Sequence, residues 1–491
     1  MLFNSFDFII FFLPITFGIY FILNKKRLTL AANAWLLCAS LFFYSYWNIA
    51  YLPLILISIL FNYVIGGILI DYDNIKKQIV SKKVIFVVGI SGNICLLCYY
   101  KYMDFFINNI NNMLNTNISL LHIILPLGIS FFTITQIAFL VDSYEGLVQE
   151  KNLLNYALFV TFFPHLLAGP ILHHKEMMPQ FAETRNKVLN YKNISRGFLL
   201  FFIGLFKKVV IADSVAKYAT AGFDVAPTLN FVEAWFTSLS YTLQLYFDFS
   251  GYSDMAIGVG LMFNIKLPIN FNSPYKAVSA IDFWRRWHIT LSNFITTYIY
   301  SAFVRSFSKI TFYKSLAAIF LAMFVSGLWH GAGWTFIIWG SLHGLALVIN
   351  HIWRSKLKIK LNFIISWLIT INFVNISFVF FRAKNFDDAL KVLKGMCGFN
   401  GIVLPKFLGK YLSLMQSSGV KFAPLLNHIN GNWYMPIIMA SLISIILFTK
   451  NSNEMTDNLD PNWKYAVFTS IIAVVGILNI TKVSEFLYFN F

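Results

Sequence analysis

Long runs of apolar residues constrain this chain more than any other feature. Hydrophobic residues make up 58% of its 491 positions and charged residues only 12%, which is about half the charged share of an ordinary soluble domain. A membrane-spanning helix needs about 20 mostly apolar residues. Roughly a dozen runs approach or reach that length, among them 8–23, 52–70, 84–100, 316–328, 363–381 and 437–448. We therefore expect an all-α protein that crosses a membrane many times.

The excess of positive charge indicates topology. Lys and Arg number 38 against 21 acidic residues, a net charge of +17. Positive charges of membrane proteins collect in cytoplasmic loops, so we infer no nucleic-acid partner, although a basic face also attracts anionic lipid headgroups. Two short basic loops are predicted to be cytoplasmic, and they contain Lys25, Lys26, Arg27, Lys76, Lys77, Lys82 and Lys83. The asparagine-rich linker 101–117 then lies outside.

Three segments do not fit a plain bundle of helices. The run 157–168 ends in Gly169 and Pro170 and precedes a basic stretch at 175–196, so we predict a re-entrant segment whose irregular backbone faces protein or water. Residues 270–291 are too polar to cross and are predicted to form an interfacial helix. Residues 385–432 form a second polar excursion. With no internal repeat or boundary visible, the whole chain, 1–491, is predicted to be one membrane domain.

His330 is the main candidate for chemistry. It lies near the end of an apolar run, and the glycines around it allow another backbone or a ligand to approach closely. An imidazole has a reference pKa of about 6.5 and so suits a general base at cellular pH. Packing between helices is the alternative. The chain has no P-loop, HExxH, GxSxG or dinucleotide-binding motif, so those chemistries have no support.

Other polar residues at membrane depth are weaker candidates. His288 is the second candidate base, whereas His343 is interpreted as a packed core histidine. Asp248 and Asp254 lie in an otherwise apolar run and must face a cavity or a donor. They are interpreted as structural groups in a broken helix, with a proton relay as the alternative. No metal site is predicted, because the pair Cys95–Cys98 lacks further ligands at a diagnostic spacing.

Several motifs together resemble one family, the bacterial membrane-bound O-acyltransferases, in the group that acetylates alginate and peptidoglycan. The matching stretches occur in the family order from end to end of the chain. They are MLFNSFDFIIFFLP at the start, FFPHLLAGPI at 162–171, YFDFSGYSDMAIG at 246–258, NFNSPY with DFWRRWHITLS at 270–292, GLWHGAGWTFIIWGSLHG at 327–344, and the terminal EFLYFNF. The stretch LHH at 172–174 departs from the usual pattern, so His173 and His174 inherit no role.

The resemblance implies a ring of roughly 11–12 transmembrane helices, with funnels from both sides meeting near the family's histidine, here His330. Its core motifs lie within 126–381, and 385–491 is a C-terminal extension. The family's second histidine matches His288. Four tryptophans are expected to line the site and exclude water. Arg285 and Arg286 are expected to contact the donor's phosphates if their segment faces the cytoplasm. The tryptophans are Trp284, Trp287, Trp329 and Trp334.

The implied donor is acetyl-CoA, used as a substrate, and no bound cofactor is expected. The acceptor is a serine of an SGNH-type extracytoplasmic partner protein or a hydroxyl of a polysaccharide, and the location is the bacterial cytoplasmic membrane. Three alternatives stay open. One is D-alanyl transfer to teichoic acid, whose proteins share the motifs but lack the long extension past residue 400. The others are a proton-coupled transporter or flippase that uses Asp248 and Asp254, and a structural docking subunit.

Overall fold

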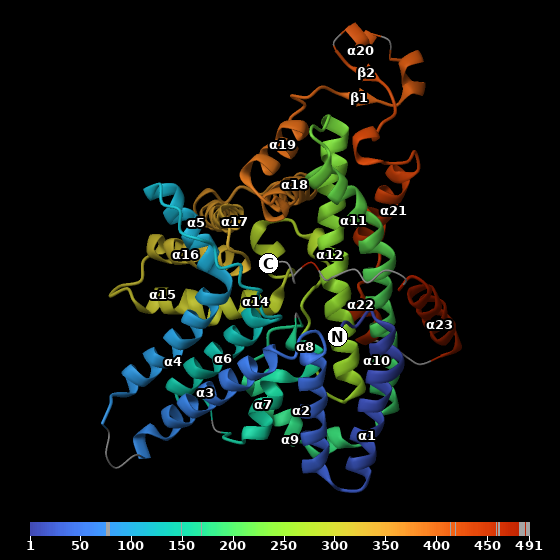
Figure 1. The fold of residues 1–491 in the computed structure, drawn as a ribbon. Coiled ribbons are helices and arrows are strands. Elements are labelled where there is room, and N and C mark those ends of the chain that lie inside the picture. Colours follow the sequence, from blue (N-terminus) through green and yellow to red (C-terminus); the bar gives the residue numbers. More distant parts are fainter. Residues whose placement is uncertain are drawn as a thin grey trace. The chain divides into compact units, whose positions relative to one another are not determined.

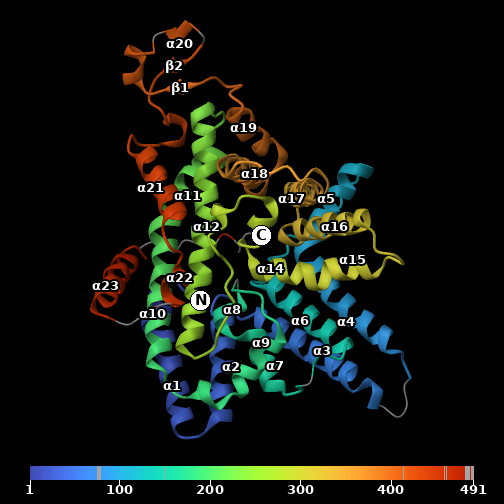
Figure 2. The same cartoon turned by 180° about the vertical axis from the view of Figure 1, so that it is seen from behind.

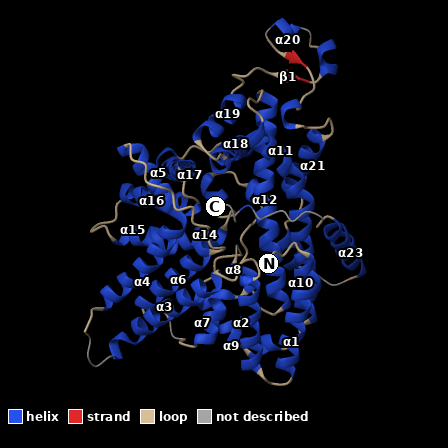
Figure 3. Ribbon diagram, in the orientation of Figure 1, coloured by secondary structure: helices blue, strands red, loops and turns tan. Residues whose placement is uncertain are grey.

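Helices make up nearly all of the regular structure that the computed structural model describes (Figure 3). It describes residues 1–74, 79–148, 150–167, 169–412, 414–417, 419–457, 459, 462–480 and 487. Within this part of the chain, strand is limited to β1 (Val403–Leu404) and β2 (Lys421–Phe422), which pair in parallel. The expected all-α fold is confirmed. Lys76, Lys77 and most of the terminal motif EFLYFNF lie outside the described residues.

Six helices of the described chain are long and apolar enough to cross a membrane. They are Asp7–Lys25, Tyr51–Asn74, Lys82–Leu114, Phe312–His330, Trp334–Leu357 and Phe363–Arg382. Four shorter apolar helices accompany them, namely Thr29–Ser45, Ile129–Tyr144, Met435–Phe448 and Trp463–Leu478. Each of the six apolar runs first named in the sequence coincides with one of these helices, so the protein is a multi-pass membrane protein.

The chain forms two compact units that interleave along the sequence, one made of 1–206, 251–270 and 456–491 and the other of 207–250 and 271–455. The single domain 1–491 therefore stays a prediction. The first unit contains α1 (Leu13–Lys25), α2 (Thr29–Ser45), α3 (Tyr51–Asp71), α4 (Lys82–Leu97), α5 (Met103–Leu114), α6 (Ile129–Tyr144), α7 (Leu153–Thr161), α8 (Phe163–Leu166), α9 (His174–Ala182), α10 (Tyr191–Phe206) and α23 (Trp463–Leu478). Within it α3 and α4 pack on α6, and α10 packs on α23.

The second unit holds the candidate histidines. Its elements are η5 (Lys207–Ala212), α11 (Asp213–Thr220), η6 (Ala221–Val225), α13 (Ala280–Trp284), α14 (Ile289–Phe294), α15 (Ser301–Arg305), α16 (Phe312–His330), α17 (Trp334–Ile352), α18 (Phe363–Arg382), α19 (Phe386–Met396), β1, α20 (Leu414–Ser417), β2 and α21 (Met435–Phe448). Two helices contribute residues to both units, α12 (Phe231–Met262) and α22 (Ser452–Asp457). Helices α16 and α17 lie side by side (Figures 1 and 2), and α18 packs on α17.

Glycines bring α16 and α17 together. A Cβ atom added at Gly327 would lie 2.5 Å from the carbonyl oxygen of Phe336, and one added at Gly340 would lie 2.6 Å from that of Met323. Because both neighbours are backbone atoms, they cannot move aside as a flexible side chain can. Small residues at helix contacts of this kind let two membrane helices approach closely. The hairpin therefore holds the last turn of α16 against α17.

Three segments differ from the sequence-based expectation, and a fourth, the predicted re-entrant run, does not. The linker 101–117 is mostly helix α5, which ends at Asn115 in a left-handed conformation. The expected interfacial helix 270–291 is interrupted and contains only the short helix α13 and the start of α14. The run predicted to be re-entrant is divided between α7 and α8 at Phe162, and its described residues are buried, as an irregular backbone that faces protein requires. Around Asp248, the expected broken helix is the continuous α12.

Candidate active site

His330 is the last residue of α16, and its side chain is buried among aromatic rings. The imidazole centroid lies 4.9 Å from those of Trp329 and Trp339 and 5.2 Å from that of Phe381, all in edge-to-face arrangements. Trp329 is its chain neighbour, Trp339 comes from α17, and Phe381 is the penultimate residue of α18. Three consecutive helices therefore surround this histidine with rings that hold it in one orientation and keep water away from it.

Trp339 was not singled out in the sequence, yet it lies at the centre of this cluster. It is 2% exposed, and its ring packs on His330, His343 and Phe381 at 4.9 Å in each case. Its indole nitrogen is buried and has no hydrogen-bond partner among the described residues. An indole N–H can only donate, and a buried donor left unpaired is costly. Trp339 therefore presents a hydrogen-bond donor beside His330 that the described residues do not use.

His343 has both ring nitrogens engaged in structural hydrogen bonds. Trp284 donates its indole N–H to Nδ1 at 3.2 Å, and Nε2 lies 2.9 Å from the hydroxyl of Ser377. Because Ser377 itself donates to the carbonyl of Val374, its oxygen accepts a hydrogen bond from the N–H at Nε2. The imidazole is thus a neutral tautomer with its proton on Nε2. This geometry agrees with the interpretation of His343 as a packed core histidine.

His288 is fully buried and has an unusual backbone. Its φ of +43° and ψ of +53° place it in the left-handed region, directly before α14. A non-glycine residue in this region costs roughly 1–2 kcal/mol, and such strain clusters at functional sites. Its ring packs perpendicular to Phe249 of α12 at 4.7 Å. A series of ring contacts leads from its neighbour Trp287 through Phe378 to Phe381, which touches His330.

The remaining tryptophan and arginine candidates divide into buried and exposed groups. Trp284 and Trp287 are buried, Trp329 is half-buried and Trp334 is 60% exposed. Arg285 is exposed, whereas Arg286 pairs with Asp282 at 2.8 Å. The structure therefore brings Trp284 and Trp329 into the ring contacts of the histidine cluster, joins Trp287 to it through Phe378, and leaves Trp334 largely at the surface. Arg285 has the exposure that a contact with a ligand requires.

Asp248 forms a buried ion pair. Its carboxylate lies 2.6 Å from the ammonium group of Lys208 in η5, which is also 3.0 Å from Asp213. Lys208 thus supplies the donor that a buried carboxylate at membrane depth requires. The pair fixes α12 to η5, one residue before the Phe249 ring that supports His288. Asp254 is also buried, 3% exposed, but belongs to the other unit.

An ion-pair cluster anchors the end of α18, next to Phe381. Asp224 of η6 lies 2.5 Å from Arg382 and 3.2 Å from Lys384. Burial alone would raise the pKa of the Asp224 carboxyl, but hydrogen bonds and positive charge from Arg382 and Lys384 outweigh it and lower the pKa below its ordinary value. The cluster therefore holds the helix end whose Phe381 ring touches His330.

Comparison with known proteins identifies the family of the chain. The sequence profile of the membrane-bound O-acyltransferase family matches residues 20–384. A peptidoglycan O-acetyltransferase of Helicobacter pylori is 46% identical over 100% of this chain and 98% of its own length. A probable alginate O-acetylase of Azotobacter vinelandii is 36% identical over 85% of this chain and 82% of its own. A teichoic acid D-alanyltransferase of Bacillus subtilis is 29% identical over 53% of this chain and 69% of its own.

Proposed function

Because the chain belongs to the membrane-bound O-acyltransferase family, we propose that it passes acetyl groups from cytoplasmic acetyl-CoA across the cytoplasmic membrane for O-acetylation of a polysaccharide outside. The protein is an acyltransferase that crosses the membrane several times. The observation that carries the acetyl assignment is the 46% identity to a peptidoglycan O-acetyltransferase along the entire chain. The similarity to the teichoic acid D-alanyltransferase is lower and covers about half of the chain, 53%, which favours acetyl over D-alanyl transfer.

His330 acts as the general base. It takes the proton of the acceptor hydroxyl while the hydroxyl oxygen bonds to the thioester carbonyl carbon. The tetrahedral intermediate then expels the thiolate of CoA, which takes the proton back from His330. His330 therefore ends each turnover in its neutral form, ready to act as a base again. The aromatic rings around His330 support this role, because a water-poor site limits hydrolysis of the thioester.

Trp339 donates its N–H to the carbonyl oxygen of the acetyl group as that oxygen becomes negative. Donors placed where charge develops are typically the largest single contribution in acyl transfer. Support comes from the buried indole nitrogen that no described residue accepts from, and from its ring contact with His330. His288 orients the donor or the acceptor, and its strained backbone is consistent with a fixed placement. Arg285 contacts the phosphates of CoA.

The acceptor is a serine hydroxyl of an SGNH-type extracytoplasmic partner protein or a hydroxyl of the polysaccharide itself. Both are neutral hydroxyl groups that need a base to react, so His330 serves either one by the same step. Peptidoglycan and alginate are the polysaccharides named for the similar proteins.

The test is acetyl transfer from labelled acetyl-CoA, measured per mole of folded protein in detergent. His330→Gln keeps hydrogen-bonding capacity but cannot take up a proton at neutral pH, so its rate should fall by at least ~10² to 10⁴, the usual contribution of general base catalysis. His288→Gln should lower the rate less, because it acts through placement.

Turnover of His330→Gln close to that of the wild type would contradict the assignment. A packing role for His330 would show itself differently, as poor expression with normal turnover in whatever protein folds. Transfer of D-alanine in place of acetate by the wild type would support the alternative function.

A further inference from the structure

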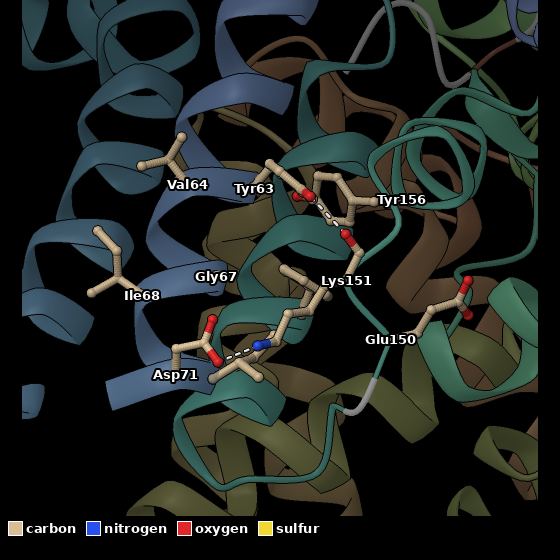
Figure 4. A pocket seen from close by; sticks show the side chains of 10 residues that line it. Tyr63, Val64, Gly67, Ile68, Asp71, Glu150, Lys151 and Tyr156 are labelled. Atoms are coloured by element: carbon tan, nitrogen blue, oxygen red, sulfur yellow. Dashed lines mark hydrogen bonds and ion pairs between the residues drawn. The ribbon is translucent and has the colours of Figure 1, made fainter. Parts of the chain in front are cut away.

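A pocket of about 440 Å³ lies in the first unit, and none of its lining residues is among those assigned to acyl transfer. Figure 4 shows its lining from α3, from the loop before α7, and from α7 itself. We propose that it binds a phospholipid whose headgroup carries both a phosphate and a primary ammonium group, as phosphatidylethanolamine does. This assignment does not depend on the proposed transfer reaction.

The pocket lies at the depth of lipid headgroups. Its α3 residues run from Tyr63 to Asp71, the last turns of the apolar span Tyr51–Asn74. A charged residue at the end of such a span marks the boundary between hydrocarbon and headgroups. The basic loop that follows is predicted to be cytoplasmic. Val64, in the same wall, is 55% exposed and faces the space that lipid occupies in a membrane. The ligand therefore comes from the surrounding lipid, with its headgroup on the cytoplasmic side.

The rim of the pocket carries charges of both signs. Lys151 forms an ion pair with Asp71, and its carbonyl accepts a hydrogen bond of 2.6 Å from the hydroxyl of Tyr63 (Figure 4). The side chains of Lys151 and Asp71 are 43% and 44% exposed, so each has room for a further partner. Glu150 adds a second carboxylate to the lining.

This set of charges selects among headgroups. One ammonium and two carboxylates leave a net charge of −1, which disfavours a ligand that carries only negative charge. A phosphate fits Lys151, and a primary ammonium fits Asp71, because it donates hydrogen bonds to carboxylates. Glu150 points away from Asp71 in Figure 4 and accepts a hydrogen bond from the amide of Asn155, so it contributes negative charge to the lining rather than a direct contact with the same ammonium. A quaternary ammonium such as that of choline has no N–H to donate. The rim therefore favours an ethanolamine headgroup over both glycerol and choline headgroups.

The floor suits an acyl chain. At Gly67 an added Cβ would meet nothing within 4 Å, so the helix surface is open there. Behind it, Tyr156 packs on Phe139 at 4.5 Å and on Tyr63 at 5.7 Å, forming an apolar wall. The missing side chain at Gly67 thus leaves space along α3 that leads from the charged rim toward the hydrocarbon.

The experiment is native mass spectrometry of the purified full chain, titrated with phosphatidylethanolamine, phosphatidylcholine and phosphatidylglycerol of identical acyl chains. We expect phosphatidylethanolamine to bind about two- to fivefold more tightly than the others, the range expected of a half-exposed ion pair. Gly67→Leu fills the open space and should reduce that binding. Gly18→Leu is the matched control, because Gly18 lies in the membrane helix α1 and is equally open. Glu150→Gln should remove the preference over phosphatidylglycerol.

Equal affinity for the three lipids, or equal loss of binding by Gly67→Leu and Gly18→Leu, would overturn the proposal. Free phosphoethanolamine supplies the same headgroup without an acyl chain, and we expect it not to compete at concentrations at which the lipid saturates the site. Competition at those concentrations would assign the pocket to a soluble ligand instead. Transfer activity is not part of the readout, so failure of this proposal and failure of the proposed reaction are distinguishable.

Discussion

The indoles of Trp284 and Trp339 lie in one cluster but have different partners. The N–H of Trp284 is used by His343, while the N–H of Trp339 is buried beside His330 with no acceptor among the described residues. A buried donor without a partner costs about 1–3 kcal/mol, so a cluster that keeps one needs a compensating use for it. The first indole is a structural donor, and we propose that the second donates to a ligand.

We expect Trp339→Phe to keep the ring packing and lose the donor. Removal of one oxyanion-binding donor typically slows an enzyme by about 10² to 10³, so kcat should fall by that order while KM changes little. The control is Trp433→Phe, at a side chain that is 83% exposed, which should leave kcat unchanged. A normal kcat for Trp339→Phe at normal protein stability would show that the indole only packs.

Sequence reasoning singled out His330 and His288, which the structure shows to be buried, and it did not single out Trp339. His330 is conspicuous because an ionisable group in an apolar run is costly. Trp334 and Trp339 carry no such mark, since both belong to the same apolar stretch and either suits a membrane helix. Only the rotation of α17 against α16 decides that Trp339 points inward and that Trp334 is 60% exposed.

At the scale of elements, the α16–α17 hairpin sets the distance between His330 and Trp339. Gly340→Ala would place a methyl group 2.6 Å from the carbonyl oxygen of Met323 and 2.8 Å from the Cα of Gly327. Overpacking against atoms that cannot move typically costs about 1–3 kcal/mol. We expect a lower temperature of thermal unfolding in detergent. Gly18→Ala, where the space is open, should not lower it, and equal behaviour of the two variants would mean that the hairpin tolerates separation.

The Asp224 cluster makes the end of α18 sensitive to acid. A lowered carboxyl pKa stabilises the folded protein at pH values above the unfolded pKa of about 3.9, and this contribution is lost as the pH falls through the folded pKa. Asp224→Asn should therefore unfold at a lower temperature than the wild type at pH 7, and the difference should shrink below pH about 4. Asp73→Asn, at an exposed carboxylate, is the control. A difference that stays constant with pH would exclude this ion-pair contribution.

Apolar length predicted the long helices, whereas local backbone conformation was not predicted. The number of spans, roughly 11–12, stays a prediction, since six helices of the described residues are long and apolar enough to cross a membrane. Each long run became a helix because an apolar segment in a membrane must satisfy its own hydrogen bonds. The asparagines of 101–117 suggested a linker, yet they sit on one side of the amphipathic helix α5, which ends only at Asn115. In 270–291 helix α13 ends at Trp284 and α14 begins only after His288, and a left-handed histidine has no sequence signal comparable to that of glycine.

At the scale of the whole molecule, the membrane topology of the segment after α7 stays a prediction. Helix α7 has only 9 residues, about 14 Å at 1.5 Å per residue, which is too short to cross a membrane. The basic stretch after it should therefore stay on the cytoplasmic side. A cysteine at Lys187 should be protected from an impermeant thiol reagent added to intact cells, in a background where the four native cysteines are replaced. A cysteine at Asn112, in the segment predicted to lie outside, should react. Labelling at Lys187 from outside would remove the re-entrant interpretation.

The glycine contact between α16 and α17 has a consequence for genetics. In a screen that scores only whether colonies acetylate their envelope, a methyl group at Gly327 or Gly340 and the loss of His330 should give the same phenotype. A map of the positions that tolerate no substitution would then not distinguish residues that hold the helices together from a residue proposed to act in the reaction. Scoring each allele for membrane-inserted protein as well as for product separates them, because scaffold alleles lose the protein and chemical alleles keep it.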